Sequence, residues 1–226
     1  MKYKLSSNAP KTEKELIIKS NKISGIRITD FCKPFNEFFS EKTKKSSGYL
    51  GKILEIYLGT SGKNFPIPDF PNLNIELKSL PLNKNMLPKN IVKICSTSFF
   101  PLETNYSWET SIVKRKLEKV LWIPFQSDKS VPYHRRRILQ PFLSNLKGYE
   151  KIIKEDYENI ITLLFLGKLN LISPTLGKYL ILKPISSNKN LTNFLNDKGE
   201  LIKTNFVGFY INKKFLKKII YENLHI

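Results

Sequence analysis

Cysteine and histidine are scarce in this sequence of 226 residues. The only cysteines are Cys32 and Cys95, and the only histidines are His134 and His225. Two cysteines so far apart imply no disulfide framework, and they favour the reducing environment of the cytoplasm. With so few thiols and imidazoles, a structural zinc site is not expected either.

Long apolar runs are missing as well. The longest, over 160–166, is far too short to span a bilayer and contains Thr162. Residues 1–19 alternate charge with short apolar pieces and show no signal-peptide core. No glycine-rich phosphate loop of the Walker or dinucleotide type is present. We therefore expect no association with a membrane and no nucleotide site of those two types.

Acidic residues are half as numerous as basic ones. The 38 Lys and Arg against 19 Asp and Glu give a net charge of +19, which suggests a polyanionic partner, nucleic acid first. The alternative source of this charge is a composition rich in Lys, Asn and Ile, typical of an AT-rich genome. A hydrophobic content of 41% is enough for a folded core, and the length suits one large domain or two closely joined lobes.

Hydrophobic periodicity predicts a mixture of helices and strands. A capping box opens the first helix, and the i, i+3, i+4 spacing over 48–59, ended by Gly59, marks the clearest one. We expect an α/β (mixed α+β) fold with a central mixed sheet flanked by helices. The expected helices span 12–23, 31–39, 48–59, 112–118, 150–166 and 215–224, the expected strands span 73–80, 91–98, 119–125, 179–182 and 206–211, and a basic loop covers 42–47.

The strand expected over 73–80 carries the most informative charges. Glu76 and Lys78 are two residues apart and point to one face, while Ile75 and Leu77 point to the opposite face and into the core. Asp69 lies in the loop that enters this strand. The sequence therefore predicts two carboxylates and one ammonium on one side of a rigid strand.

This arrangement suits metal-assisted hydrolysis of a phosphodiester. Asp69 and Glu76 supply oxygen ligands for a hard divalent cation, the Leu77 carbonyl offers another, and Lys78 can stabilise an attacking hydroxide. The alternative is an ordinary edge strand with solvated charges. Glu55 lies on the preceding helix, next to its apolar stripe, and its side chain can reach the same site. Its position on the helix alone favours a solvated or interfacial Glu.

Beyond this pattern, several segments recur in order through most of the sequence in one known family. They are Gly48–Gly59, Pro68–Pro71, Ile75–Pro81, Trp108–Ser111, Lys116–Leu117, Val120–Pro124 and Gly208–Phe215. In these segments the chain resembles the MutH family of mismatch-repair endonucleases.

The resemblance implies a type II restriction-endonuclease-like fold with two lobes around a DNA cleft, within a single endonuclease domain over 1–226. It implies Mg²⁺-dependent nicking of the unmethylated strand at hemimethylated GATC sites. It also implies a monomer that is switched on by MutL after MutS finds a mismatch.

Particular residues fall on the family's functional positions. Asp69, Glu76 and Lys78 match the catalytic triad, and Glu55 matches an additional active-site Glu. Tyr210 matches the aromatic residue that senses adenine methylation, and Lys116 matches a DNA-contacting lysine.

Other basic residues are expected to contact DNA with less sequence support. The Arg135–Arg137 run supplies Arg135 and Arg136 as phosphate contacts, with a solvated run as the alternative. Lys183 begins a Lys-Pro-Ile segment where the family resemblance leads us to expect Arg-Pro-Lys, and Lys lacks the bidentate geometry of Arg on a guanine edge. A second departure is Ser47, which stands where a basic residue is expected near the scissile phosphate.

Two other functions remain open. One is a GATC-specific restriction endonuclease that cuts both strands of unmethylated duplex, which usually needs a dimer or a second catalytic core. The other is a basic DNA-binding protein without activity, against which the intact Asp69, Glu76 and Lys78 argue.

Overall fold

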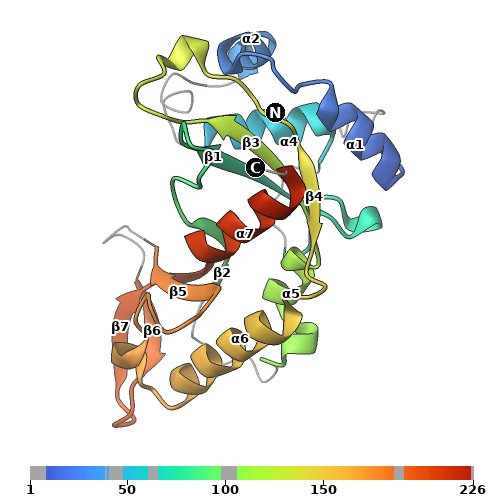
Figure 1. Ribbon diagram of the computed structural model, residues 1–226. Helices are drawn as coiled ribbons and strands as arrows, with labels where there is room; N and C mark the ends of the chain where they lie inside the picture. The colour runs from blue at the N-terminus through green and yellow to red at the C-terminus, as the bar shows by residue number, and fades with distance from the viewer. Residues whose placement is uncertain are drawn as a thin grey trace. The chain divides into compact units, whose positions relative to one another are not determined.

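Figure 1 shows the computed structural model of the chain, which describes residues 9–38, 40, 48–60, 66–97, 106–185 and 191–224. The basic loop expected over 42–47 lies outside these residues. The chain divides into two compact units, and neither is continuous in sequence. Unit 1 comprises Met1–Lys89, Lys119–Asn145 and Ile219–Ile226, and unit 2 comprises Asn90–Glu118 and Leu146–Lys218.

Unit 1 is built on a small mixed sheet in the order β1-β3-β4. The first two strands are parallel, with Glu76 opposite Val120, and the last two are antiparallel. Its strands are β1 (Glu76–Leu82), β3 (Lys119–Gln126) and β4 (Phe142–Asn145), its α-helices are α1 (Glu13–Asn21), α2 (Ile28–Cys32) and α4 (Tyr49–Leu58), and its 3₁₀ helices are η1 (Lys33–Phe38), η2 (Pro71–Leu73) and η4 (Tyr133–Arg135).

Two helices of unit 1, α1 and α4, begin and end close to where the sequence predicts. The Thr12 hydroxyl accepts the Glu15 N–H at 3.1 Å, and the Glu15 carboxylate accepts the Lys11 N–H at 2.7 Å, so two groups at the start of α1 are satisfied. Gly59 ends α4 with a φ of 89°, a left-handed conformation that favours glycine. The apolar stripe of α4 is buried in one core with Ile75 and Leu77 of the loop and strand that carry the predicted site.

Unit 2 contains an antiparallel sheet, a separate hairpin, and both α- and 3₁₀ helices. The sheet has the order β2-β8-β5, and β6 pairs only with β7 among the described strands. Its strands are β2 (Val92–Thr97), β5 (Leu180–Pro184), β6 (Leu191–Leu195), β7 (Leu201–Asn205) and β8 (Val207–Ile211), its α-helices are α5 (Ile112–Leu117) and α6 (Glu150–Phe165), and its 3₁₀ helices are η3 (Trp108–Thr110) and η5 (Leu169–Leu171). Helix α7 (Lys213–Leu224) begins in unit 2 and ends in unit 1.

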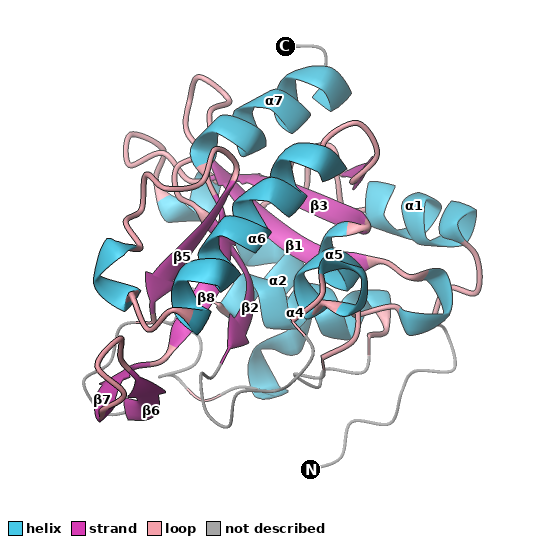
Figure 2. Cartoon of the chain, turned by 90° about the horizontal axis from the view of Figure 1, so that it is seen from below, coloured by secondary structure: helices cyan, strands magenta, loops and turns pink. Residues whose placement is uncertain are grey.

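Helix α6 covers one face of the β2-β8-β5 sheet (Figure 2). The rings of Tyr157 on α6 and Phe209 on β8 have their centroids 5.5 Å apart. The buried Asp156 carboxylate, from the same helix, accepts the backbone N–H groups of residues 178, 179 and 180 at 2.7–2.8 Å. These bonds fix the start of β5 against α6.

Several predictions about the fold are confirmed and others are wrong. The expected helices that became α1, α4, α5, α6 and α7 are present, as are the strands that became β2, β3, β5 and β8. The single central sheet is wrong, because the described strands form three separate sheets. The expected helix over 31–39 is replaced by the end of α2 followed by η1, with residue 39 outside the described part.

The strand expected over 73–80 begins later than predicted, and it is more deeply buried. Residues 71–73 form η2 instead, and Asn74 adopts a positive φ of 54°, so the extended run starts at β1. Glu76 is only 1% exposed, although alternation predicted an open face for it. Its neighbours Val120 and Trp122 on β3 are buried too, which shows that this face is also covered.

Among the described helices, none is both long and apolar enough to cross a membrane.

Candidate active site and DNA-contacting residues

A tight turn brings Asp69 back onto the strand that follows it. Phe70 and Ile75 exchange backbone hydrogen bonds of 2.9 and 3.2 Å, and η2 with the left-handed Asn74 closes the loop between them. Asp69 Oδ2 then accepts the N–H of Leu77 at 2.9 Å. Because β1 lies at the edge of its sheet, this bond fixes the Asp69 carboxylate beside the outer edge of the strand.

Glu76 and Lys78 form an ion pair on the same face of β1. The Lys78 ammonium contacts Glu76 Oε1, and the two side chains are 18% and 1% exposed. A carboxylate this buried is costly unless a cation or hydrogen-bond donors neutralise it. The pair therefore gives the buried Glu76 carboxylate a counter-ion at the start of β1, next to Leu77 and its partner Asp69.

Glu55 of α4 belongs to the same electrostatic cluster. Burial raises the pKa of the Glu55 carboxyl, and the negative charges of Asp69 and Glu76 raise it further, while Lys78 and Lys52 oppose the shift. The structure thus brings together all four residues that the sequence singled out for chemistry. It does so within unit 1.

The oxygen donors of this cluster are few but suited to a hard cation. In the described part of the chain, no group of three or more His, Cys, Asp and Glu is placed to hold a metal ion by itself. The N–H and C=O of one strand residue point to the same edge, so the Leu77 carbonyl lies on the side of Asp69. The donor set is therefore Asp69, Glu76 and this carbonyl, and water must complete the coordination of the cation.

The basic residues expected to contact DNA are distributed over both units. Lys116 is half-buried on the short helix α5, which Ser111 caps by accepting the Lys114 N–H at 3.0 Å. Lys183 lies on β5 directly opposite Gly208 of β8. Tyr210, two residues further along β8, is half-buried, and burial raises the pKa of its hydroxyl.

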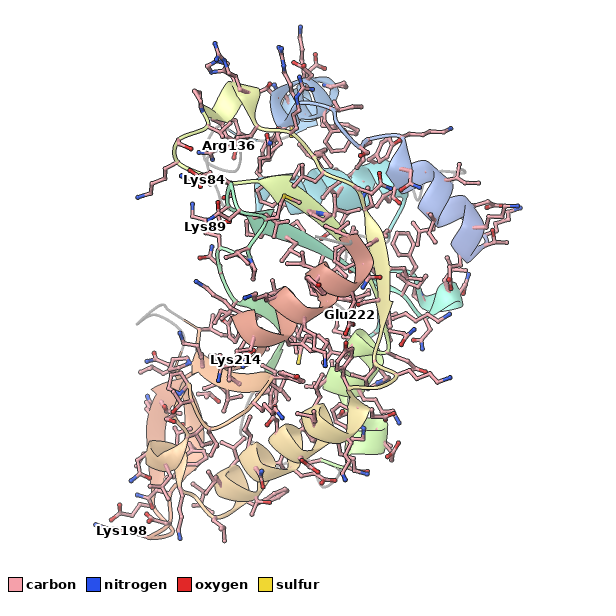
Figure 3. The ribbon with its side chains drawn as sticks, viewed as in Figure 1. Lys84, Lys89, Arg136, Lys198, Lys214 and Glu222 are labelled. Atoms are coloured by element: carbon pink, nitrogen blue, oxygen red, sulfur yellow. The ribbon has the colours of Figure 1, made fainter. Side chains whose placement is uncertain are left out.

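Neighbouring arginines of the predicted phosphate-binding run have different environments. The Arg136 guanidinium donates to the carbonyls of Val131 and Asp128, each at 3.0 Å, and lies over the Tyr133 ring. In Figure 3, Arg136 lies near Lys84 and Lys89. The backbone N–H of Lys84 and the ammonium of Lys89 also donate hydrogen bonds to the segment that follows β3. Arg136 therefore holds this loop together.

Arg135 is exposed and opens onto a hollow of about 520 Å³. Arg27, His134 and Arg137 also line this hollow. Arg27 and Arg137 are brought together by an isolated antiparallel bridge between their segments. The position of Arg27 beside this run was not predicted, because the two are more than a hundred residues apart in the chain.

Asp156 is a positioning residue that was not predicted from the sequence. It is a buried acid in a helix, and its three backbone bonds orient β5 and with it Lys183. The signal available in the sequence was an acidic residue at an apolar-facing position of α6, between Ile153 and Ile160.

Comparison with known proteins gives a consistent result. A family model described as "MutH: DNA mismatch repair enzyme MutH" matches residues 58–156, a range that contains Asp69, Glu76 and Lys78. The DNA mismatch repair protein MutH of Pasteurella multocida (strain Pm70) is 35% identical over 219 residues, which cover 95% of this chain and 97% of that protein. The protein of the same name from Escherichia coli O6:K15:H31 (strain 536 / UPEC) is 34% identical over 215 residues, covering 93% of each chain. The similarity thus extends through both units.

Proposed function

Because the chain belongs to the MutH family of DNA mismatch repair enzymes, we propose that it nicks the unmethylated strand of hemimethylated GATC sites during mismatch repair, by Mg²⁺-dependent hydrolysis of a phosphodiester bond. The observation that carries this proposal is the fixed position of Asp69. Its bond to the Leu77 N–H joins the loop carboxylate to the strand that presents Glu76 and Lys78.

The donor set at the edge of β1 fits Mg²⁺. This ion prefers oxygen ligands, keeps several waters and is usually bound in proteins through one or two carboxylates. Asp69, Glu76 and the Leu77 carbonyl would hold it. When bound, the ion lowers the pKa of a coordinated water and neutralises the charge that develops on the phosphate.

The side chains around these donors have separate roles in the hydrolysis. The Lys78 ammonium, held by Glu76, stabilises the negative charge of the attacking hydroxide. Glu55 has a raised pKa, which makes its carboxylate a better proton acceptor than that of an ordinary Glu, and it takes up the proton that the attacking water loses. Asp69 and Glu76 stay in place because a backbone N–H and an ammonium fix them before substrate binds.

Recognition and regulation form the second half of the proposal. Lys116 and Lys183 contact DNA, and Tyr210 lies beside the exocyclic amine of the adenine in GATC. We expect a monomer that MutL activates after MutS has found a mismatch, and the type II restriction-endonuclease-like fold implied by the family. The family membership supports these points.

A plasmid assay with defined methylation tests the proposed function. The purified protein would be incubated with plasmids carrying one GATC site in unmethylated, hemimethylated or fully methylated form, with Mg²⁺ or with EDTA. We expect Mg²⁺-dependent conversion of hemimethylated plasmid to the open circular form, faster when MutL is added, and almost none for fully methylated plasmid. Linear product from unmethylated plasmid as the main species would indicate a restriction enzyme, and binding without cleavage would indicate a DNA-binding protein.

A further inference from the structure

One face of the β2-β8-β5 sheet carries lysines on both sides of β8. Lys93 of β2 lies opposite Tyr210, and Lys183 of β5 lies opposite Gly208. Residues directly opposite in an antiparallel pair project from the same face of the sheet. Since Gly208 and Tyr210 are two apart on β8, all four residues share one face. Phe209 points the other way and is buried against α6.

A β-bulge in β2 keeps Lys93 on this face. The register shifts between Lys93 and Cys95, which leaves Ile94 as the extra residue without a partner on β8. Ile94 is buried at 4% exposure, whereas Lys93 is exposed. A bulge redirects side chains by inserting one residue into a strand. Here it sends the apolar side chain inward and leaves the lysine on the Tyr210 face.

Lys93 and Tyr210 approach each other over Gly208. A Cβ atom at Gly208 would lie 3.2 Å from Cε2 of the Tyr210 ring and 3.3 Å from Cε of Lys93. The lysine stem and the edge of the ring therefore flank the same small space above the strand. The ammonium is bonded directly to Cε, so its charge lies at the end of the stem that borders this space.

We propose that Lys93 is a further DNA-contacting residue, whose ammonium binds the phosphate next to the nucleotide that Tyr210 faces. The inference rests on the proposed nuclease function, because that function brings DNA to Tyr210. An ammonium is a compact charge with three donors and no fixed plane, which suits a phosphate oxygen better than the edge of a base. Together with Lys183 it gives this face two positive charges around one aromatic ring.

The test compares Lys93→Gln with a matched control, Lys151→Gln. Lys151 is an exposed lysine of α6, the helix that covers the opposite face of the sheet, and its substitution removes the same charge. Equilibrium affinity is measured without metal, over a series of salt concentrations, for a GATC duplex and for a duplex of scrambled sequence. Melting temperatures of the variants verify that each is folded.

We expect Lys93→Gln to weaken binding several-fold on both duplexes and to lower the slope of log affinity against log salt by about 0.9, the value for one phosphate contact. Lys93→Arg should retain the affinity and the slope. The inference is overturned if Lys93→Gln behaves like Lys151→Gln, or if its loss is confined to the GATC duplex with an unchanged slope. Failure of the wild type to nick GATC plasmid would refute the proposed function instead, since this binding comparison does not depend on cleavage.

Discussion

At the scale of single residues, the site is a set of charges that neutralise one another only in part. Glu76 has Lys78 as its counter-ion, and Asp69 has a backbone N–H, whereas Glu55 faces two other carboxylates. Sequence reasoning found all of these residues from alternation and from the family resemblance. It did not find the burial of Glu76, because alternation along one strand carries no information on what covers its second face.

Glu55 provides a prediction about stability and pH. Burial is the largest cause of the raised Glu55 pKa, and the negative charges of Asp69 and Glu76 add to it. Between the ordinary and the raised pKa the folded protein binds more protons than the unfolded chain, so stability falls as pH rises through this window. Glu55→Gln cannot ionise, so it should stabilise the protein above this window and lose the advantage below about pH 4.

Urea unfolding in EDTA at several pH values measures this difference. Glu158→Gln, an exposed acidic position on α6, is the control for a simple change of net charge. A stability difference between wild type and Glu55→Gln that stays constant with pH would contradict the account.

Tyr210 provides a prediction about methylation. If its ring lies beside the adenine amine, a methyl group there meets the ring, and the shorter side chain of Tyr210→Ser leaves room for it. We expect the variant to keep cleavage of unmethylated GATC and to raise cleavage of fully methylated GATC relative to it. The ratio of the two cleavage rates is the measurement. Lower stability with an unaltered ratio would mean that Tyr210 only packs in the sheet.

At the scale of elements, the ends of helices could be predicted from neighbouring residues, whereas the pairing of strands could not. The start of α1 and the end of α4 were predictable because a cap and a positive φ depend on a few adjacent residues. Which strands pair was not predictable, because the partners β2 and β8 are more than a hundred residues apart. Strand β4 was missed because its four residues are too few to establish an alternation.

Asp156 provides a prediction for the contact between α6 and β5. Asp156→Ala would leave three backbone N–H groups without their acceptor. Those of Tyr179 and Leu180 are buried, and each buried group of this kind costs about 1–3 kcal/mol. We expect a loss of roughly 3 kcal/mol or more in the free energy of unfolding, and a smaller loss for Asp156→Asn, which keeps one acceptor oxygen. Denaturant unfolding measures both, with the exposed neighbour Glu155→Ala as the control. Equal effects of Asp156→Ala and Glu155→Ala would contradict this role.

At the scale of the whole molecule, the chain carries a net charge of +19 in two units. Charge alone did not separate a DNA-binding protein from one with a lysine-rich composition. The length and the family resemblance led us to expect two lobes, but not that each unit would be built from separate stretches of the chain, because contacts between distant stretches cannot be read from the sequence.

The salt dependence of DNA binding tests what this charge does. If lysines and arginines contact phosphates, log affinity falls linearly with log salt, by about 0.9 for each contact. Lys116→Gln should lower that slope by about one unit, whereas Lys198→Gln, at the exposed turn between β6 and β7, should leave it unchanged. If the affinity of the wild type for DNA does not change with salt concentration, the +19 charge reflects mainly the lysine-rich composition.

The most direct test of the central claim is the rate at which Glu76→Gln nicks a hemimethylated GATC duplex in Mg²⁺, with each strand labelled separately. Glu158→Gln is the matched control, since it makes the same change at an exposed position of α6. We predict that wild type and control cut the unmethylated strand, and that Glu76→Gln cuts it at least roughly a hundredfold more slowly while still binding the duplex. Cleavage by Glu76→Gln at a rate close to that of the wild type would contradict the assignment of the active site to the start of β1.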